Sequence, residues 1–483
     1  MQKKYLNIAV AGALAAMSVG AHAADTYFDN FTPLAASAGT TATPATPITL
    51  SSPNFSQVSL ADRTTQNAKA AGSNSGSWDM ITANETGTNA GRYLFMPFET
   101  NTGGVQRVDL WDNNYNTRTV TIVAPGSQGF VSGDASRWTP WGSYLTAEES
   151  WGTGSTKGRL FEVTNSTTAA ANGGNFVQRN IIPRVSHEGL AFDKQNTMYF
   201  IDELNGGSVY KYVSNNANAT NGDDYFASGQ SFVMRVGDGS AFGGTGAASW
   251  VALTDTNGAA LAGVVMTSYG AVDGRATADL GRAGNLGSEA TNPTTSFLGT
   301  EYNRPEDLET KTLANGNEGI FFATTDSQQV FMMELDSAGN TAVKLFVDRN
   351  TIDLATGVAV GSALTSPDNL AIDAAGNIYI IEDRNGGVDD DIWFAKDINH
   401  DGDLLDAGEG IGRWASNGTP GSEFTGLYFD KFNANVAYVN IQHPNTGVDR
   451  LIQISAVPEP ESYAMFLAGL GLVGFAARRR AAK

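Results

Sequence analysis

A strand–turn–strand unit that recurs along the chain constrains the fold more than any other feature. Its clearest copy runs from Ser366 to Phe394, SPDNLAIDAAGNIYIIEDRNGGVDDDIWF. The apolar run Leu370–Ile372 leads into residues 373–377, DAAGN, which predict a tight hairpin turn because Gly and Asn adopt positive φ readily. The β-branched and aromatic run Ile378–Ile381 predicts the second strand. Two carboxylates, Glu382 and Asp383, follow directly.

The same unit appears elsewhere. Ser186–Tyr212, SHEGLAFDKQNTMYFIDELNGGSVYKY, repeats the pattern, and looser copies begin at Arg304 and Phe424. Residues 92–110 and 141–163 have the same rhythm. That makes roughly six units, spaced near or above the ~40–50 residues of a propeller blade. Antiparallel sheets repeated around an axis bury each blade against its neighbours. We therefore predict an all-β fold, a six-bladed β-propeller with a long insertion.

The rest of the chain divides by composition. Residues 1–24 combine an early lysine pair, an apolar core and Ala-His-Ala, which predicts a signal peptide. Residues 25–75 are rich in Ala, Ser, Thr and Pro and are expected to be a low-complexity segment, either mostly loop or with one strand that closes the ring. The propeller is expected over 76–456. Within it, about 214–300 lacks the blade rhythm, so we expect an insertion or an irregular extra blade there. Residues 457–483 form a separate tail.

The tail has three parts in a fixed order. Pro458-Glu459-Pro460 comes first, an apolar stretch covers 463–477, and an arginine cluster follows at 478–480. The apolar stretch is shorter than the ~20 residues that a transmembrane helix needs, although a plain membrane anchor is the alternative. The tail resembles a PEP-CTERM sorting signal. That resemblance implies processing by an exosortase-type enzyme, an extracellular or cell-surface location and an exopolysaccharide matrix as a partner.

Charge excludes some partners. The chain has 50 acidic and 30 basic residues, for a net charge of −20. Such a protein repels nucleic acid and anionic membranes, so we expect no nucleic-acid partner. The carboxylate excess suits divalent cations, with acidic solubility as the alternative explanation. There are 0 cysteines, which excludes disulfides, thiolate ligands and thiolate nucleophiles.

Acidic and amide residues stand where the predicted strands begin or end. They are Glu148 and Glu149, Glu188, Glu306 and Asp307, Asp368 and Asn369, and Glu382 and Asp383. Equivalent positions of different blades converge at one end of a propeller channel. Carboxylates packed together raise one another's pKa, and a bound cation removes that penalty. The pattern predicts a multi-metal site, although each residue taken singly could be a turn cap or a solvated side chain.

Four of these segments resemble the PhoX-type alkaline phosphatases. They are WGSYLTAEE at 141–149, SHEGL at 186–190, RPEDLE at 304–309 and SPDNLA at 366–371. The resemblance spans about 92–454. It implies a six-bladed propeller with calcium ions and an oxo-bridged iron pair that hydrolyses phosphate esters.

The resemblance also implies roles for individual residues. A metal cluster can polarise a phosphoryl oxygen and supply a nucleophile, and an arginine can neutralise charge on the transferred group. By position, Arg304 holds the phosphate and Glu306 is both a metal ligand and a catalytic residue. The further metal ligands are Glu149, Glu188, Asp368 and Asn369. The family's cysteine ligand is replaced here by Ala147, which offers no donor to iron.

A second calcium signal lies at Asp397, Asn399, Asp401 and Asp403. Alternating oxygen ligands with a glycine at the sixth place are typical of the start of an EF-hand loop. The glutamate expected at the twelfth place comes one residue later, so an acidic turn is the alternative.

The predicted function is an exported, metal-dependent phosphoric ester hydrolase with calcium, and iron as the second metal. One alternative is a non-catalytic, calcium-stabilised propeller of the matrix or cell surface. Another is a lactonase-like propeller with a central calcium, against which residues 304–307 argue. Arg137 is a candidate second cation or a surface arginine. His187 is a candidate ligand or acid, or a packing residue.

Overall fold

The computed structural model describes residues 26–39, 42–65, 76–150, 155–262, 264, 267–268, 274–275, 299–384 and 390–457. The predicted signal peptide and the sorting residues Pro458, Glu459 and Pro460 lie outside these residues. Within them, no helix has the length and apolar character needed to cross a bilayer.

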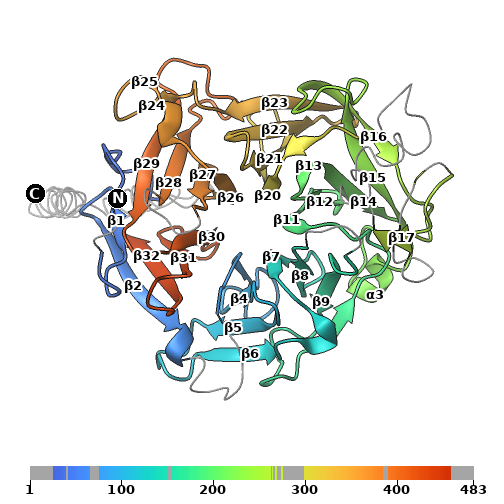
Figure 1. Cartoon of the computed structure of the whole chain (residues 1–483), viewed down its shortest axis with the longest axis horizontal. Helices are drawn as coiled ribbons and strands as arrows, with labels where there is room; N and C mark the ends of the chain where they lie inside the picture. Colours follow the sequence, from blue (N-terminus) through green and yellow to red (C-terminus); the bar gives the residue numbers. More distant parts are fainter. Residues whose placement is uncertain are drawn as a thin grey trace, which may run out of the picture.

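Six blades, each built on four antiparallel strands, are arranged around a central axis (Figure 1). The prediction of an all-β, six-bladed propeller is confirmed. In chain order the first three blades are β3 (Thr82–Ala83), β4 (Tyr93–Pro97), β5 (Val105–Asp109) and β6 (Thr119–Val123); β7 (Gly133–Trp138), β8 (Tyr144–Glu148), β9 (Leu160–Val163) and β10 (Phe176–Gln178); and β11 (His187–Phe192), β12 (Met198–Asp202), β14 (Val209–Ser214) and β15 (Gly229–Val236).

The last three blades are β20 (Pro305–Thr312), β21 (Glu318–Thr324), β22 (Gln329–Leu335) and β23 (Thr341–Val347); β26 (Pro367–Ile372), β27 (Ile378–Glu382), β28 (Asp390–Lys396) and β29 (Gly410–Asn417); and β30 (Glu423–Phe429), β31 (Val436–Gln442), β32 (Arg450–Ala456) and β2 (Phe55–Asp62). The strands nearest the central axis are β7, β11, β20 and β26 in the second to fifth blades and β30 in the sixth (Figure 1).

Short elements decorate this ring. They are β1 (Ile48–Leu50), β13 (Asn205–Gly207), β16 (Gly246–Ala252), β17 (Thr267–Ser268), β18 (Gly274–Arg275), β19 (Tyr302–Asn303), β24 (Ile352–Asp353), β25 (Val358–Ala359), the α3 turn (Gly222–Tyr225) and the 3₁₀ turns η1 (Ser127–Gly129) and η3 (Gly361–Ala363). Within the stretch of about 214–300, β15 completes the third blade. β16 then pairs with both β15 and β23, which joins the outer edges of the third and fourth blades.

The sixth blade closes the ring with strands from both ends of the described chain. β2 pairs antiparallel with β32, from Phe55 opposite Ala456 to Asp62 opposite Arg450. Between the blades, each of six clusters of buried hydrophobic side chains combines residues of two neighbouring sheets. Burial of a large apolar side chain contributes about 1.5–3 kcal/mol. The ring is therefore held together mainly by these apolar layers.

The repeated hairpin turn has a physical basis in one aspartate. Asp373 accepts hydrogen bonds from the backbone amide of Asn377 (3.0 Å) and the hydroxyl of Tyr379 (3.1 Å). Gly376 has φ +85°, as the turn requires. Asp193 makes the corresponding contacts in the third blade. These aspartates stabilise turns at the ends of the innermost strands, away from the carboxylates that begin those strands.

Candidate metal centre at the channel mouth

The innermost strands of four successive blades begin with an irregularity that carries an acidic side chain. In β7, β11, β20 and β26 the pairing register shifts within the first residues of the strand. A bulge of this kind adds an unpaired residue and re-aims its side chain. We call the end of the channel where these strands start the channel mouth. The acidic residues on the four bulges are Asp134, Glu188, Glu306 and Asp368.

These side chains converge in two overlapping groups of three. Oxygens of Asp134, Glu149 and Glu188 lie within 4.8 Å of one another, and so do oxygens of Glu188, Glu306 and Asp368. Glu188 belongs to both groups. The structure therefore brings together four of the residues proposed from the sequence as metal ligands, and adds Asp134.

Burial and mutual repulsion raise the pKa of every member. For Glu188, loss of solvation has the largest effect, followed by the charges of Asp134, Glu203 and Glu306. For Glu306 the order is loss of solvation and then Asp368 and Glu203. Glu306 is 0% exposed, and neither of its carboxylate oxygens has a hydrogen-bond partner among the described residues. Arg304 offsets only part of the negative charge that the buried carboxylates carry together, so this arrangement suits a bound cation.

A second set of acids follows the second strand of the blades. Glu149 is such a residue: its backbone amide donates to the carbonyl of Ser132 at 2.9 Å. The same bond places three equivalent acids beside the mouth, namely Glu99, Glu203 and Asp383. Asp134, Glu99 and Glu203 were not singled out from the sequence. The GDASRW sequence of β7 lacks the apolar run of the other units, but alignment of the residue pairs that end β8, β12 and β27 could have found Glu203.

The two neighbouring acids at the end of β8, and the two at the end of β27, differ in what they contact. Glu148 accepts hydrogen bonds from Nε of Arg159 (2.8 Å) and from the amide of Val131 (3.3 Å). Glu382 accepts from the amide of Thr365 and from Nε1 of Trp393, at 2.8 and 2.9 Å. The first acid of each pair therefore stabilises its own sheet. The second acid, Glu149 or Asp383, lies among the carboxylates of the mouth.

Arg304 places a positive charge at the edge of this group. Its Nη2 donates to Oε1 of Glu203 at 2.6 Å and lies 3.4 Å from Oε1 of Glu306. Burial alone would lower the pKa of the guanidinium, but Glu306, Glu203 and Asp368 together raise it. The side chain is 31% exposed, so it can meet a ligand that enters from solvent.

The second residue of the bulge in the fourth and fifth blades faces the neighbouring blade. Asn369 accepts a hydrogen bond on Oδ1 from the amide of Gly426 at 2.7 Å, and Asp307 accepts on Oδ2 from the amide of Leu370 at 3.1 Å. Both contacts link one innermost strand to the next. The structure thus engages Oδ1 of Asn369 in holding the fifth and sixth blades together.

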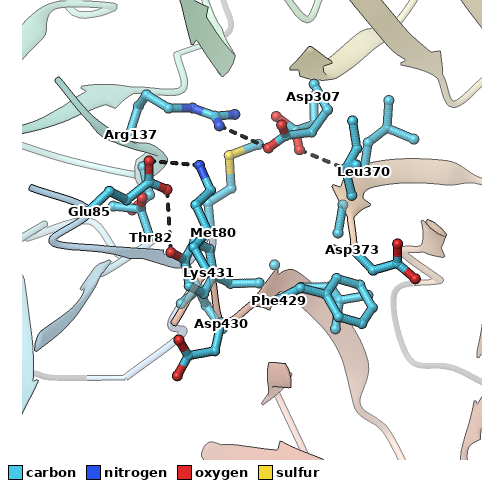
Figure 2. Close-up of a pocket in the computed structure, with 18 of the residues that line it drawn as sticks. Met80, Thr82, Glu85, Arg137, Asp307, Leu370, Asp373, Phe429, Asp430 and Lys431 are labelled. Carbon is cyan, nitrogen blue, oxygen red and sulfur yellow. Dashed lines mark hydrogen bonds and ion pairs between the residues drawn. The ribbon is translucent and has the colours of Figure 1, made fainter. Parts of the chain in front are cut away.

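Arg137 lies at the other end of the innermost strands. It pairs with Glu309 (2.9 Å) and donates to the carbonyl of Leu308 (2.9 Å). There it lines a cavity of about 410 Å³ together with Asp307 and Lys431 (Figure 2). The structure therefore separates Arg137 from Arg304 and from the carboxylates of the mouth.

His187 and Ala147 are both packing residues in this structure. His187 is 0% exposed, with its ring centroid 5.5 Å from that of Phe200. Ala147 is also fully buried, in the apolar cluster that contains Leu145 and Leu190 between the second and third blades. The two groups of three acids that the described residues form at the mouth offer carboxylate oxygens.

The predicted calcium loop lies after β28, remote from the mouth. Asp397 accepts hydrogen bonds from the amide of Asp401, and its Oδ2 lies 3.3 Å from Nζ of Lys311. The side-chain amide of Asn399 donates to Asp401 at 3.0 Å, and Asp403 accepts from a backbone amide two residues ahead. These oxygens are engaged within the loop, and the two groups of three acids that the described residues form both lie elsewhere.

Comparison with known families gave two matches. Residues 134–445 match the family model described as alkaline phosphatase PhoX, and residues 456–480 match the PEP-CTERM protein-sorting motif. The second match indicates export and a cell-surface or extracellular location. Comparison with curated proteins gave no match.

Solved structures are similar only at a low level. An auxiliary nutrient binding protein from Bacteroides ovatus has 7% identity and a TM-score of 0.41, over 79% of this chain and 70% of that chain. YCF48 bound to D1 peptide has 8% identity and a TM-score of 0.33, over 85% and 99%. The polysaccharide lyase Uly1 has 10% identity and a TM-score of 0.32, over 79% and 90%. Similarity this low carries no inference about function.

Proposed function

Because the chain belongs to the PhoX alkaline phosphatase family, we propose that it is an exported, metal-dependent hydrolase of phosphate esters whose metal cluster lies at the channel mouth. The observation that carries this proposal is the convergence of buried carboxylates from successive blades around Glu188. Family membership supports a phosphatase-type hydrolase acting on a phosphate ester. The metal dependence and the ligand set are the proposed part.

The donor set fits a hard cation. Asp134, Glu149, Glu188, Glu306 and Asp368 offer only carboxylate oxygens, and those of Glu306 are buried without hydrogen bonds within the described chain. Calcium takes 6–8 oxygen ligands in a flexible geometry. Carboxylates also accept iron, which here would lack a thiolate because Ala147 has none. Calcium is therefore the first candidate and iron the second.

The chain's own residues supply the rest of the chemistry. A metal bound here would polarise a phosphoryl oxygen and lower the pKa of a bound water. The side chain of Arg304 lies beside the carboxylates of the mouth and is partly exposed to solvent. Its planar guanidinium can donate hydrogen bonds to two phosphate oxygens at once. In the free protein Glu203 and Glu306 hold this guanidinium in place, so little reorganisation is needed when a phosphate arrives.

One experiment tests the proposal directly. The purified mature chain is stripped with a chelator, reloaded with calcium, with iron or with both, and assayed on p-nitrophenyl phosphate alongside elemental analysis. Activity that returns with metal and vanishes in chelator supports the proposal. Activity that is indifferent to chelation contradicts it.

A second function is favoured by the apolar surroundings of Ala147. In this alternative the chain is a non-catalytic propeller, stabilised by calcium and displayed in the exopolysaccharide matrix or on the cell surface after exosortase-type processing of its tail. A calcium-dependent melting temperature without hydrolysis under any metal condition would identify it.

A further inference from the structure

A cavity of about 410 Å³ lies at the end of the innermost strands opposite the channel mouth (Figure 2). The first, second, fourth, fifth and sixth blades all contribute to its lining, so it lies on the axis of the ring. Its volume is within the range of about 300–1,000 Å³ that is typical of small-molecule sites. The acids in the two groups of three at the mouth are not part of this lining. The cavity is therefore separate from the proposed metal centre.

Much of the cavity wall is apolar. Met80, Leu370, Leu427 and Phe429 line it, and Figure 2 shows Met80, Leu370 and Phe429 around the central space. These four side chains are 2–5% exposed, so packing against the surrounding blades holds them in place. A preformed apolar wall of this kind binds the hydrocarbon part of a ligand.

The charged groups at the rim of the cavity have partners within the protein. Lys431 pairs with Glu85 at 2.7 Å, and Glu85 also accepts from the hydroxyl of Tyr428 at 3.3 Å (Figure 2). Asp373 and Asp430 accept hydrogen bonds from backbone amides of their own hairpin turns, at 3.0 and 2.8 Å. The rim charges are thus already engaged.

The charges deeper in the cavity are not balanced. Arg137 interacts electrostatically with both Glu309 and Asp307, but its guanidinium pairs with Glu309 at 2.9 Å. Asp307 is 4% exposed, and its oxygens accept from the neutral backbone amides of Leu308 (2.7 Å) and Leu370 (3.1 Å). Burial, and then Glu309, raise the pKa of Asp307 to about 7, although Arg137 acts in the opposite direction. Two carboxylates therefore share one cation, and the second positive charge is missing.

We propose that this cavity binds a small primary amine, with the ammonium group on Asp307 and the hydrocarbon chain against Leu370 and Leu427. The ammonium group supplies the missing charge, and the Asp307 oxygens retain lone pairs for a charge-assisted hydrogen bond. The lining suits a metal ion poorly, because calcium takes 6–8 oxygen ligands and apolar groups occupy much of this wall. An anionic ligand would be repelled by the acids of the lining, which are Glu85, Asp307, Glu309, Asp373 and Asp430.

Isothermal titration calorimetry of the mature chain with propylamine, butylamine and hexylamine tests the proposal. At pH 8 these amines are charged, because an alkylammonium group has a pKa of about 10.4. One amine should bind per chain, with an affinity that rises about fourfold for each added methylene. The matched ligands 1-hexanol and hexanoate lack the positive charge. 1-Hexanol should bind about tenfold more weakly than hexylamine or worse, and hexanoate should not bind.

Two pairs of variants locate the amine. Ala374 is an exposed residue of the lining, so Ala374→Trp should obstruct the cavity and weaken hexylamine binding by about tenfold or more. Ala375→Trp adds the same side chain at the next exposed residue, outside the lining, and should bind like the wild type. Asp307→Asn should bind hexylamine no more tightly than 1-hexanol. Its control is Asp193→Asn, which changes a buried turn aspartate of the third blade and should keep the preference for the amine.

Three results would overturn the proposal: no binding of hexylamine to the wild type, equally tight binding of 1-hexanol, or equal affinities in Ala374→Trp and Ala375→Trp. Displacement of hexylamine by calcium would assign the site to an inorganic cation and would also overturn it. If melting curves show that Asp307→Asn is unfolded, the pair of tryptophan variants decides alone. Hydrolysis enters none of these measurements, so the amine site stands or falls separately from the proposed hydrolase function.

Discussion

The guanidinium of Arg304 lies between Glu203 and Glu306, at 2.6 and 3.4 Å, and these two acids come from different blades. The contact ties the third blade to the fourth at the channel mouth. It also gives an otherwise acidic site a fixed positive charge that faces solvent. Substrate binding and metal binding can therefore be separated by substitution.

Arg304→Ala should lower turnover on a phosphomonoester while leaving metal content unchanged, because the proposed partner of the guanidinium is the phosphate. Loss of one preorganised charged donor is expected to reduce kcat by a factor on the order of 10²–10³. Steady-state kinetics with elemental analysis of the same preparation measure both effects. Lys431→Ala removes an exposed cation at the far cavity and should leave turnover as it is. An equal loss in both variants would contradict the role of Arg304.

Glu306→Gln should abolish hydrolysis and reduce metal content together, because it removes a charged ligand from a group that depends on charge balance. Glu309→Gln is the matched control on the same strand, since Glu309 pairs with Arg137 at the far end of the channel. Robust hydrolysis by purified Glu306→Gln would place the chemistry elsewhere in the chain.

Calcium should raise the melting temperature of the wild type. A ligand that binds only the folded state stabilises it by about 2.7 kcal/mol at ~100-fold excess over Kd. Differential scanning calorimetry in chelator and in calcium measures the shift. Identical curves would count against the channel mouth and also against the loop at Asp397.

Stability should fall with rising pH in a range set partly by Asp307. Burial, and then Glu309, raise the pKa of Asp307 to about 7 from a usual value of 3.8. The folded state thus keeps this proton at pH values where the unfolded state has lost it. The resulting loss of stability starts near pH 4 and is complete above about pH 7. Urea unfolding of the chelated protein at several pH values in this range gives the free energy of unfolding as a function of pH. This free energy should fall less steeply with pH in Asp307→Asn than in the wild type. An equally steep fall in both would exclude Asp307 as the titrating group.

Ala147→Cys should raise iron occupancy by adding a thiolate donor two residues before Glu149. The position is fully buried in an apolar layer, so the added sulfur should also cost about 1–3 kcal/mol of stability through overpacking. Iron content after loading, measured against the wild type, checks the first effect, and thermal unfolding checks the second. Unchanged iron content would show that the sulfur stays in the apolar layer.

The repeat pattern predicted the propeller and the convergence of Glu188, Glu306 and Asp368, because hairpin turns and strand composition are local properties that sequence reports well. The direction in which each acidic side chain points could not be predicted from the sequence. Within one bulge Asp368 joins the mouth while Asn369 contacts the next blade, and sequence spacing does not reveal which side a bulged residue takes. Asp134 was not predicted from the sequence because β7 has little of the apolar pattern that identifies the innermost strands of the other blades.

The pairing of β2 with β32 has a consequence for how this protein is made. The two strands lie at opposite ends of the described chain, so the ring has no closed form until Ala456 is available to meet Phe55. β32 follows the other blade strands in the sequence, so it leaves a ribosome or a translocating pore after them. Ring closure therefore joins two strands of very large sequence separation, and slow folding follows from this high contact order. The sorting motif that begins at residue 456 is contiguous with β32, so the strand that closes the ring and the motif leave that pore one directly after the other.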